Sequence, residues 1–401
     1  MFENIIGQER IVEQLRAEIA GHQLPGALLF YGDAYTGKLS TALELARAMS
    51  CREKGEWGCN CSSCRSHRVL DHPYTLMLGT RYFLEEISAS SDALMRSRSE
   101  GARYLYIRAV KKLARRFDPI IWEGNDQRIK KVQSQIASLE EELDVLYPGN
   151  PLPEGDELKS SIDAIAVLAA ELVRVMPRDN IPIDHVRAVN SWVHTTSAAS
   201  PKIVIFENAD RMGAGSRNAL LKTLEEPPGG TCFILISTRK GRIMPTILSR
   251  VRQYHFPDRG DKASSDVLQK IFRINGPQYP DLRSFFLAYR GVPLEKLHAQ
   301  ARHFFNYVWG DAEWEPEKLE DFLTDTNLPL YFVPFLEELS RELQSCMHGR
   351  DGAGKLPFAV LEKWNADMRQ ALVQFEHFNQ SPDLLLEGLL YSMKEKMKES
   401  V

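Results

Sequence analysis

The chain lacks long hydrophobic runs, an excess of either charge, and cysteines outside one short segment. No apolar stretch approaches the ~18 residues that suggest a membrane-spanning helix, and the first residues lack the basic start and apolar run of a signal peptide. We therefore expect a cytoplasmic protein with no membrane contact. A formal net charge of −4 provides no general attraction to nucleic acid, so DNA binding would need a local basic patch.

Four of the six cysteines lie between residues 51 and 64. Such crowding in a reducing compartment is typical of a metal cluster rather than a disulfide framework. Four thiolates are enough for a closed tetrahedral zinc site, which would be structural. Free thiols remain the alternative, because the single residue between the second and third cysteines is a tighter spacing than the usual two. The candidate zinc ligands are Cys51, Cys59, Cys61 and Cys64.

The alternation of apolar segments predicts an α/β domain with helical additions. The chain has 401 residues, 43% of them hydrophobic and 26% charged, which is typical of a globular protein with two or three domains. Short apolar runs predict buried strands, and segments with helical spacing predict helices. The predicted strands are 27–31, 74–78, 202–206, 232–236 and a short segment ending near residue 256; the predicted helices are 9–20, 38–50 and 216–226.

Helical patterns dominate from about residue 80 to residue 179 and again after residue 258. Apolar residues recur every three or four positions within 129–146 and 158–172, and a helix-breaking turn separates them, which predicts an antiparallel hairpin. The segment 103–117 carries six Lys and Arg residues with interspersed aromatics. It is either a DNA-binding face or the solvated side of a helix.

A glycine loop between a predicted strand and a predicted helix favours phosphate binding. It runs from Gly32 to Lys38, with Gly37 before the lysine, and fits the pattern G-x-x-x-x-G-K. The hydroxyl that should follow and hold magnesium is missing, because Leu39 stands there. Ser40 comes one position late, about 100° round the helix. The candidate nucleotide-binding residues are Gly32, Gly37, Lys38, Ser40 and Glu207.

The strand at 202–206 ends in Glu207-Asn208, where a phosphate-loop ATPase usually carries two acidic residues. Glu207 can approach a metal ion, but the Asn208 carboxamide cannot accept a proton from water. With Leu39, this makes two independent losses, so we do not expect ATP hydrolysis at this site. The retained lysine keeps binding of ATP and Mg²⁺ open.

Arg250 follows Ser249 after the segment Pro245-Thr246-Ile247-Leu248. An arginine at a domain edge can stabilise the charge that develops on a γ-phosphate bound by a neighbouring subunit. A solvated surface arginine is the alternative, since Arg252 is nearby and arginine is common.

In this order the motifs resemble the AAA+ subunits of the bacterial replicative clamp loader, which act in the DNA polymerase III holoenzyme. The resemblance covers residues 1–79 and 181–257 and includes the N-terminal segment, phosphate loop, cysteine module and arginine segment. The stretch 218–228, NALLKTLEEPP, is close to a hallmark of the family. The losses at Leu39 and Asn208 resemble the delta-prime type, the stator of the ring.

The resemblance implies an AAA+ core at 1–257, with a zinc module at 51–64 and an insertion at about 80–179 that has no counterpart in the family pattern. A helical lid at 258–297 and a helical collar at 298–401 would follow. The implied partners are the gamma/tau and delta subunits, the sliding clamp and primer-template DNA, with Arg250 serving a neighbour's ATP site. The alternatives are a gamma/tau-like motor that hydrolyses ATP and a scaffold acting through the insertion.

Overall fold

The computed structural model spans residues 1–401 and forms two compact units, Met1–Phe286 and Leu287–Val401, each treated by itself below. The predicted division at 257/258 and 297/298 stays a prediction. The structure describes residues 1–123, 126–177, 180–195, 200–276, 278–310, 328–347, 357–378 and 380–398.

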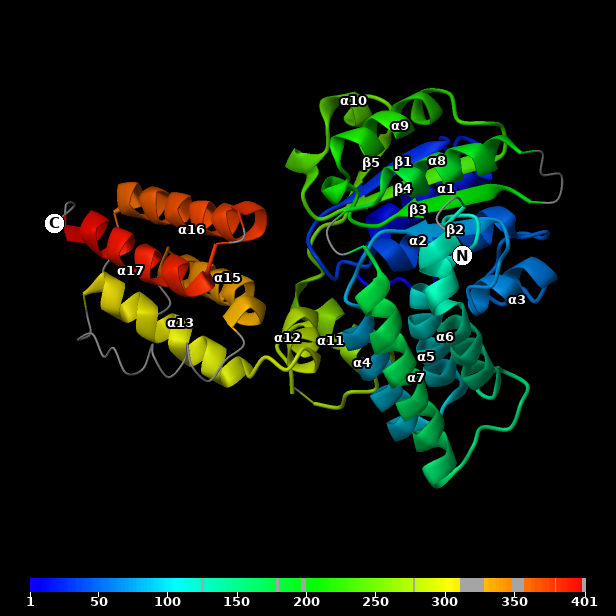
Figure 1. Cartoon of the computed structure of the whole chain (residues 1–401), viewed down its shortest axis with the longest axis horizontal. Coiled ribbons are helices and arrows are strands. Elements are labelled where there is room, and N and C mark those ends of the chain that lie inside the picture. Colours follow the sequence, from blue (N-terminus) through cyan, green and yellow to red (C-terminus); the bar gives the residue numbers. More distant parts are fainter. Residues whose placement is uncertain are drawn as a thin grey trace. The chain divides into compact units, whose positions relative to one another are not determined.

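A five-stranded parallel sheet organises the first unit (Figure 1). The strand order is β2-β3-β4-β1-β5, and every neighbouring pair is parallel. The five predicted strands are confirmed within about one residue at each end where bounds were given. Their bounds are β1 Ala27–Tyr31, β2 Thr75–Leu78, β3 Lys202–Phe206, β4 Thr231–Ser237 and β5 Arg252–His255.

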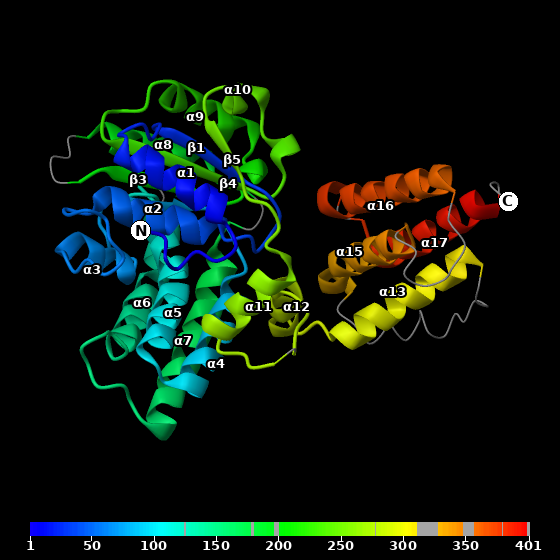
Figure 2. The same cartoon turned by 180° about the vertical axis from the view of Figure 1, so that it is seen from behind.

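Both faces of the sheet are covered, which is why its strands appear in the sequence as continuous apolar runs. Alternate residues such as Phe30 and Ile205 pack with α1 (Glu9–Ala20) and α2 (Lys38–Ser50). Helix α1 is seen in front of the sheet in Figure 2. The intervening residues pack against the opposite layer, which contains α8 (Ile183–His194), α9 (Ala214–Glu225) and the insertion.

The described residues of the insertion contain four α-helices. They are α4 (Phe83–Ser97), α5 (Glu100–Ala114), α6 (Asp126–Asp144) and α7 (Gly155–Val175), and a short η1 (Arg115–Phe117) follows α5. Helices α6 and α7 pack along each other, so the predicted hairpin is confirmed. Helices α4 and α5 form a second packed pair, which the sequence analysis did not resolve.

Short elements complete the first unit, and the described residues of the second unit form helices joined by turns. Its core surrounds the buried Trp364, whose indole N–H donates to the Met393 carbonyl oxygen at 2.9 Å. The short elements are α3 Ser62–Arg68, η2 Ala209–Arg211, η3 Lys240–Arg242, α10 Pro245–Leu248, α11 Gly260–Lys270 and α12 Leu282–Tyr289. The helices of the second unit are α13 Leu294–Trp309, α15 Leu328–Met347, α16 Phe358–Phe378 and α17 Pro382–Lys398.

The described helices include none whose length and apolar character would let it span a bilayer.

Candidate functional site

The phosphate loop lies at the carboxyl end of β1 and is closed on its own lysine. Lys38 is buried, and its Nζ donates to the Gly32 carbonyl oxygen at 2.7 Å, to the Thr36 hydroxyl at 3.1 Å and to the Asp33 carbonyl oxygen. Burial is the main cause that lowers the pKa of Lys38 to about 8. In this conformation the Lys38 ammonium donates its hydrogen bonds to oxygen atoms of the loop. In a nucleotide-bound site it would donate them to a phosphate.

An arginine from outside the predicted motif approaches the last turn of this loop. Gly37 has φ 92° and caps α2, and a Cβ there would lie only 2.2 Å from Nη2 of Arg259. The left-handed backbone favours glycine at this position, and the short distance shows how closely the Arg259 guanidinium approaches the loop. Arg259 therefore adds a second positive group beside Lys38.

The hydroxyl expected after Lys38 has no substitute in α2. Leu39 is buried in the core between the sheet and α2, and Ser40 is exposed. The next hydroxyl, on Thr41, is buried and donates to the Gly37 carbonyl oxygen at 3.0 Å. The structure thus places Ser40 away from Lys38's hydrogen-bonding network.

Glu207 is held by two arginines from outside the sheet. The Arg81 Nη1 donates to its Oε1 at 2.9 Å, and the Arg116 Nη2 donates to its Oε2. All three side chains are less than a tenth exposed. Arg81 follows β2, and Arg116 lies in η1. Two residues of the insertion therefore pair with the carboxylate that the sequence pattern assigns to metal binding.

A second buried carboxylate extends the cluster. Glu86, on α4, forms an ion pair with Arg81, whose Nη2 lies 3.0 Å from its Oε2, and a second ion pair with Lys112 of α5. The five groups carry three positive and two negative charges, a sum of +1. Two unit charges about 4 Å apart interact by about 4 kcal/mol at an effective dielectric constant of about 20. A divalent cation at Glu207 would meet this repulsion while competing with both guanidinium groups.

Asn208 has a structural role, although it stands where a phosphate-loop ATPase usually carries its second acidic residue. Its backbone is left-handed, with φ 53° and ψ 46°, a conformation that asparagine tolerates better than most residues. Its Nδ2 donates to the Thr80 carbonyl oxygen at 2.6 Å. The side chain therefore fixes the start of the insertion beside β3.

The tip of the phosphate loop is covered by aromatic rings from two helical elements. The Tyr35 ring lies 5.2 Å from that of Phe286 in α12, nearly parallel to it, and 5.1 Å from that of Tyr82. Tyr82 and Phe286 are themselves 4.9 Å apart. The loop, the insertion and α12 thus share one aromatic contact within the first unit.

Both interpretations of the basic segment 103–117 are wrong, because most of its charged groups bind other parts of the fold. Arg103 is buried and donates to the carbonyl oxygens of Leu146, Tyr147 and Asn150. Arg108 and Arg115 reach the chain around α3 and β2, where Arg108 donates to the His67 and Arg68 carbonyls and Arg115 to the His72 and Thr75 carbonyls. Lys111 pairs with Asp71, which follows α3, and with Glu140 of α6.

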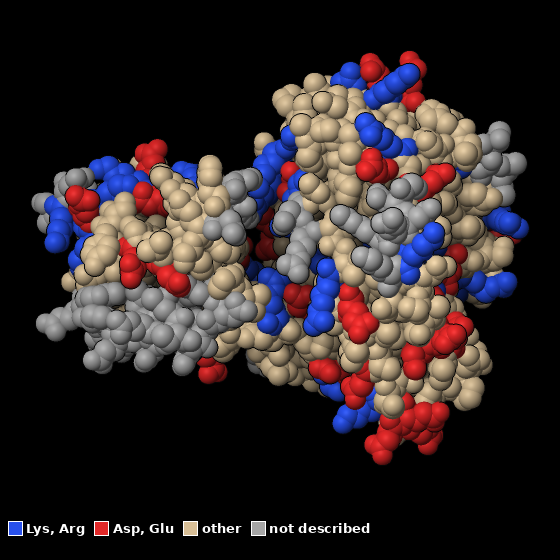
Figure 3. Space-filling model, viewed as in Figure 1, with Lys and Arg blue, Asp and Glu red and all other residues tan. Residues whose placement is uncertain are grey.

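The free end of the insertion carries acidic charge. Glu154, Asp156 and Glu157 are exposed where α7 begins, and acidic side chains gather at the lower end of the molecule in Figure 3. Phosphate groups would be repelled there. On the face shown, charges of both signs are otherwise interspersed.

Arg250 lies between α10 and β5, at the amino ends of the sheet strands, whereas the phosphate loop lies at their carboxyl ends. Its Nη1 donates to the Thr246 carbonyl oxygen at 2.8 Å, and its Nη2 pairs with Glu225 at 3.3 Å. The side chain is 28% exposed. These contacts orient the guanidinium at the surface of the unit.

The four cysteines converge although they come from a loop and a short helix. Cys51 follows α2, Cys59 lies in the loop, Cys61 caps α3, and Cys64 lies within α3. Their sulfur atoms are all within 4.8 Å of one another, and those of Cys51 and Cys59 are 3.6 Å apart. Zn–S bonds of about 2.3 Å in a tetrahedron need sulfurs about 3.8 Å apart. The cluster can therefore hold such a metal despite the close spacing of Cys59 and Cys61.

Sequence reasoning missed Arg81, Arg116 and Arg259 around the nucleotide loop. Arg81 comes just after a predicted strand, so the rule that ligands bind at the carboxyl ends of parallel strands could have singled it out. Arg116 was noticed only as part of a basic helix. Neither pattern predicts that both guanidinium groups share the Glu207 carboxylate.

Comparison with known proteins gives one family and several partial relatives. The family model described as "DNA polymerase III, delta subunit" matches residues 7–143 and 156–259, more than half of the chain. A DNA polymerase III subunit delta′ from Pseudomonas aeruginosa is 38% identical over 125 residues, which are 30% of this chain and 37% of that protein. A DNA polymerase III subunit tau from Bacillus subtilis is 34% identical over 103 residues, 25% of this chain and 18% of that protein.

The chain thus spans well under half the length of these curated relatives. A solved structure of a DNA polymerase III gamma subunit-related protein from Thermotoga maritima shares 19% identity, over 55% of this chain and 82% of that one. Its TM-score of 0.33 is too low to establish a shared fold.

Proposed function

The chain belongs to the DNA polymerase III delta subunit family, and we propose that it is a delta-prime-like AAA+ subunit of the replicative clamp loader. In this role it binds the other loader subunits and helps to place the sliding clamp on primer-template DNA in the cytoplasm. It acts as a stator: it hydrolyses no ATP and supplies Arg250 to the ATP site of a neighbouring subunit.

The position of Arg250 relative to its own phosphate loop carries the proposal. Strands β1 and β5 are parallel, with Arg252 opposite Leu28, and Gly32 follows the far end of β1. Four residues of strand separate these two levels, about 13 Å at about 3.3 Å per residue. Because Arg250 precedes Arg252, its backbone lies still further from its own nucleotide loop, at the amino ends of the strands. Any phosphate that Arg250 stabilises belongs to another chain.

The contacts of Glu207 support the absence of hydrolysis. A metal-binding carboxylate must be free to contact the ion, whereas the Glu207 carboxylate is buried and already paired with Arg81 and Arg116. Asn208 supplies no base, and Leu39 supplies no hydroxyl. These features weigh against the gamma/tau-like motor.

We further propose that Cys51, Cys59, Cys61 and Cys64 bind one structural zinc ion. The convergence of four sulfurs supports a closed site with no position for a reacting water. The ion would fix the loop between α2 and α3.

The experiment is ATP turnover by the reconstituted loader, stimulated by clamp and primed DNA. Arg250→Ala is compared with Arg252→Ala, a matched control two residues away whose side chain is 51% exposed and pairs with Glu18. Loss of an arginine finger lowers the rate at its site by about 10³-fold or more. We expect stimulated turnover and clamp loading to fall for Arg250→Ala and to stay near the parent value for Arg252→Ala.

Lys38→Ala separates the stator from the motor. The stator keeps its stimulated turnover in this variant, because its own site does no chemistry. Loss of turnover in both Lys38→Ala and Arg250→Ala would establish the motor instead. Unchanged turnover in both would favour the scaffold, and clamp loading that survives deletion of residues 80–179 would then count against it.

A further inference from the structure

Arg47 lies buried near the end of α2, beside the cysteine cluster. Its side chain is 3% exposed. Its Nε and Nη2 donate to the two carboxylate oxygens of Glu44 at 2.9 and 2.7 Å, and Nη2 also donates to the Gly55 carbonyl oxygen at 2.8 Å. Its Nη1 donates to the Glu56 carbonyl oxygen at 3.1 Å and to Cys64 Sγ at 3.0 Å. All five N–H groups of the guanidinium are therefore used.

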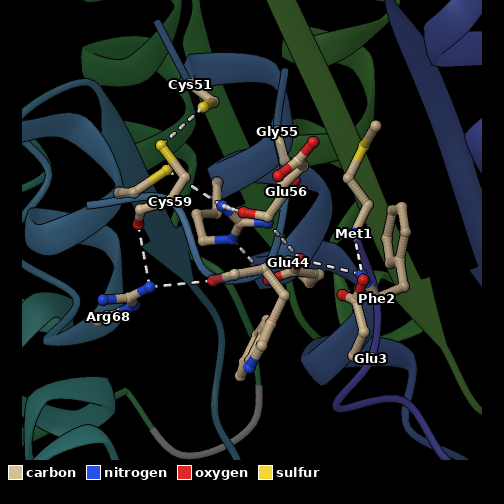
Figure 4. A network of polar contacts seen from close by, with 12 residues as sticks. Met1, Phe2, Glu3, Glu44, Cys51, Gly55, Glu56, Cys59 and Arg68 are labelled. Carbon is tan, nitrogen blue, oxygen red and sulfur yellow. Dashed lines mark hydrogen bonds and ion pairs between the residues drawn. The ribbon is translucent and has the colours of Figure 1, made fainter. Parts of the chain in front are cut away.

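The partners of Arg47 come from three separate segments around the cluster. Figure 4 shows Glu44 between the N-terminal segment and the loop that contains Gly55 and Glu56. The same Glu44 carboxylate accepts from the Phe2 backbone N–H at 3.0 Å. A guanidinium stays protonated in proteins, and the ion pair with the buried Glu44 carboxylate stabilises its charge. The guanidinium is thus a fixed positive charge.

Cys64 is the cluster sulfur that most needs such a charge. It is fully buried, whereas the other three cysteines are partly exposed. Four thiolates with one Zn²⁺ carry a net charge of −2, and buried charge is costly unless it is paired and hydrogen-bonded. Among the described residues, the sulfurs of Cys51, Cys59 and Cys61 contact backbone N–H groups or one another.

We propose that Arg47 is a positioning residue for the metal, which orients the Cys64 thiolate and balances part of the charge of the zinc–thiolate cluster. This inference rests on the proposed zinc site. It also joins that site to the helix that begins at Lys38, since both residues lie on α2. A group that hydrogen-bonds to a metal ligand typically changes metal affinity by about 10- to 100-fold when it is lost.

Arg68 provides a matched control. It holds the same loop through hydrogen bonds to the carbonyl oxygens of Trp57 and Cys59 and to the Asn60 side chain. These contacts involve oxygen acceptors, not a sulfur. Arg68→Met therefore tests loop support alone, and Arg47→Met tests loop support together with the contact to the thiolate.

The test measures Zn²⁺ affinity of the full chain by chelator competition, and the sulfur-to-metal charge-transfer band after Co²⁺ replaces zinc. We expect Arg47→Met to lose about 10- to 100-fold in affinity and to shift the band to lower energy, because the sulfur loses a hydrogen bond. Arg68→Met should keep the parent band. Arg47→Lys, which retains the charge, should recover part of the affinity and supports the test if Arg47→Met fails to fold.

The outcomes separate this inference from the zinc site on which it rests. A parent chain that binds no zinc would remove the site itself. A parent chain that binds zinc, with an unchanged affinity and band in Arg47→Met, would overturn the role of Arg47 alone. Equal affinity losses in Arg47→Met and Arg68→Met without a band shift would also overturn it, because loop support would then explain both.

Discussion

At the scale of single residues, the nucleotide site differs from its sequence pattern through contacts that distant residues supply. The loop glycines, Lys38 and Leu39 could be identified from the sequence, because a phosphate loop has a fixed spacing. Asn208 could be identified because it follows a predicted strand. The partners of Glu207 were not readable in this way, since Arg81 and Arg116 lie 126 and 91 positions from it. Their meeting depends on how the insertion packs on the sheet, which no local spacing encodes.

This pairing predicts that Glu207 stabilises the fold without any nucleotide. Glu207→Ala leaves two buried guanidinium groups without their shared carboxylate, and breaking a buried ion pair costs about 3–5 kcal/mol. We expect a loss of that order in the free energy of unfolding, measured with denaturant in the absence of ATP and magnesium. Glu225→Ala is the control, because its exposed pair with Arg250 contributes about 0–1 kcal/mol. Equal stability of Glu207→Ala and the parent would show that the arginines do not depend on Glu207.

At the scale of elements, the strands and the hairpin were predictable because their patterns are strictly periodic. A parallel strand covered on both faces is continuously apolar, as 203–206 is, and α6 and α7 each present one apolar stripe. Helix α5 was misjudged, because charged side chains usually mark a solvated face. Here they contact other parts of the fold, where Arg103 donates to backbone carbonyl groups and Lys112 pairs with the Glu86 carboxylate. This arrangement becomes visible only once the neighbouring elements are in place.

Arg103 should therefore fix the turn between α6 and α7. Arg103→Met removes the donors to three carbonyl oxygens, and a lost hydrogen bond from a charged group costs about 1.5–3 kcal/mol. We expect faster amide hydrogen exchange in residues 145–154, with unchanged exchange in the sheet. Arg174→Met, an exposed position on α7, should leave both regions unchanged. Uniformly faster exchange after Arg103→Met would mean that Arg103 supports the whole unit and not this turn.

At the scale of the whole molecule, the first unit separates a closed phosphate loop from an exposed arginine. The loop follows β1 and Glu207 follows β3, whereas Arg250 precedes β5. Because the strands are parallel, Arg250 lies at their amino ends and the other two lie at their carboxyl ends. The sequence order of the motifs already suggested a subunit that serves a neighbour. The sheet register adds the separation between Arg250 and its own loop, which supports the proposed role of Arg250 at another subunit's site.

Trapping of a transition-state mimic tests this central claim most directly. ADP with aluminium fluoride mimics the transferring phosphoryl group, whose charge an arginine finger stabilises, so the nucleotide trapped per reconstituted loader reports how many sites such an arginine completes. We predict that Arg250→Ala traps one nucleotide fewer per copy of this chain, whereas Lys38→Ala traps as many as the parent. An unchanged number for Arg250→Ala, or a loss caused by Lys38→Ala, would contradict the account.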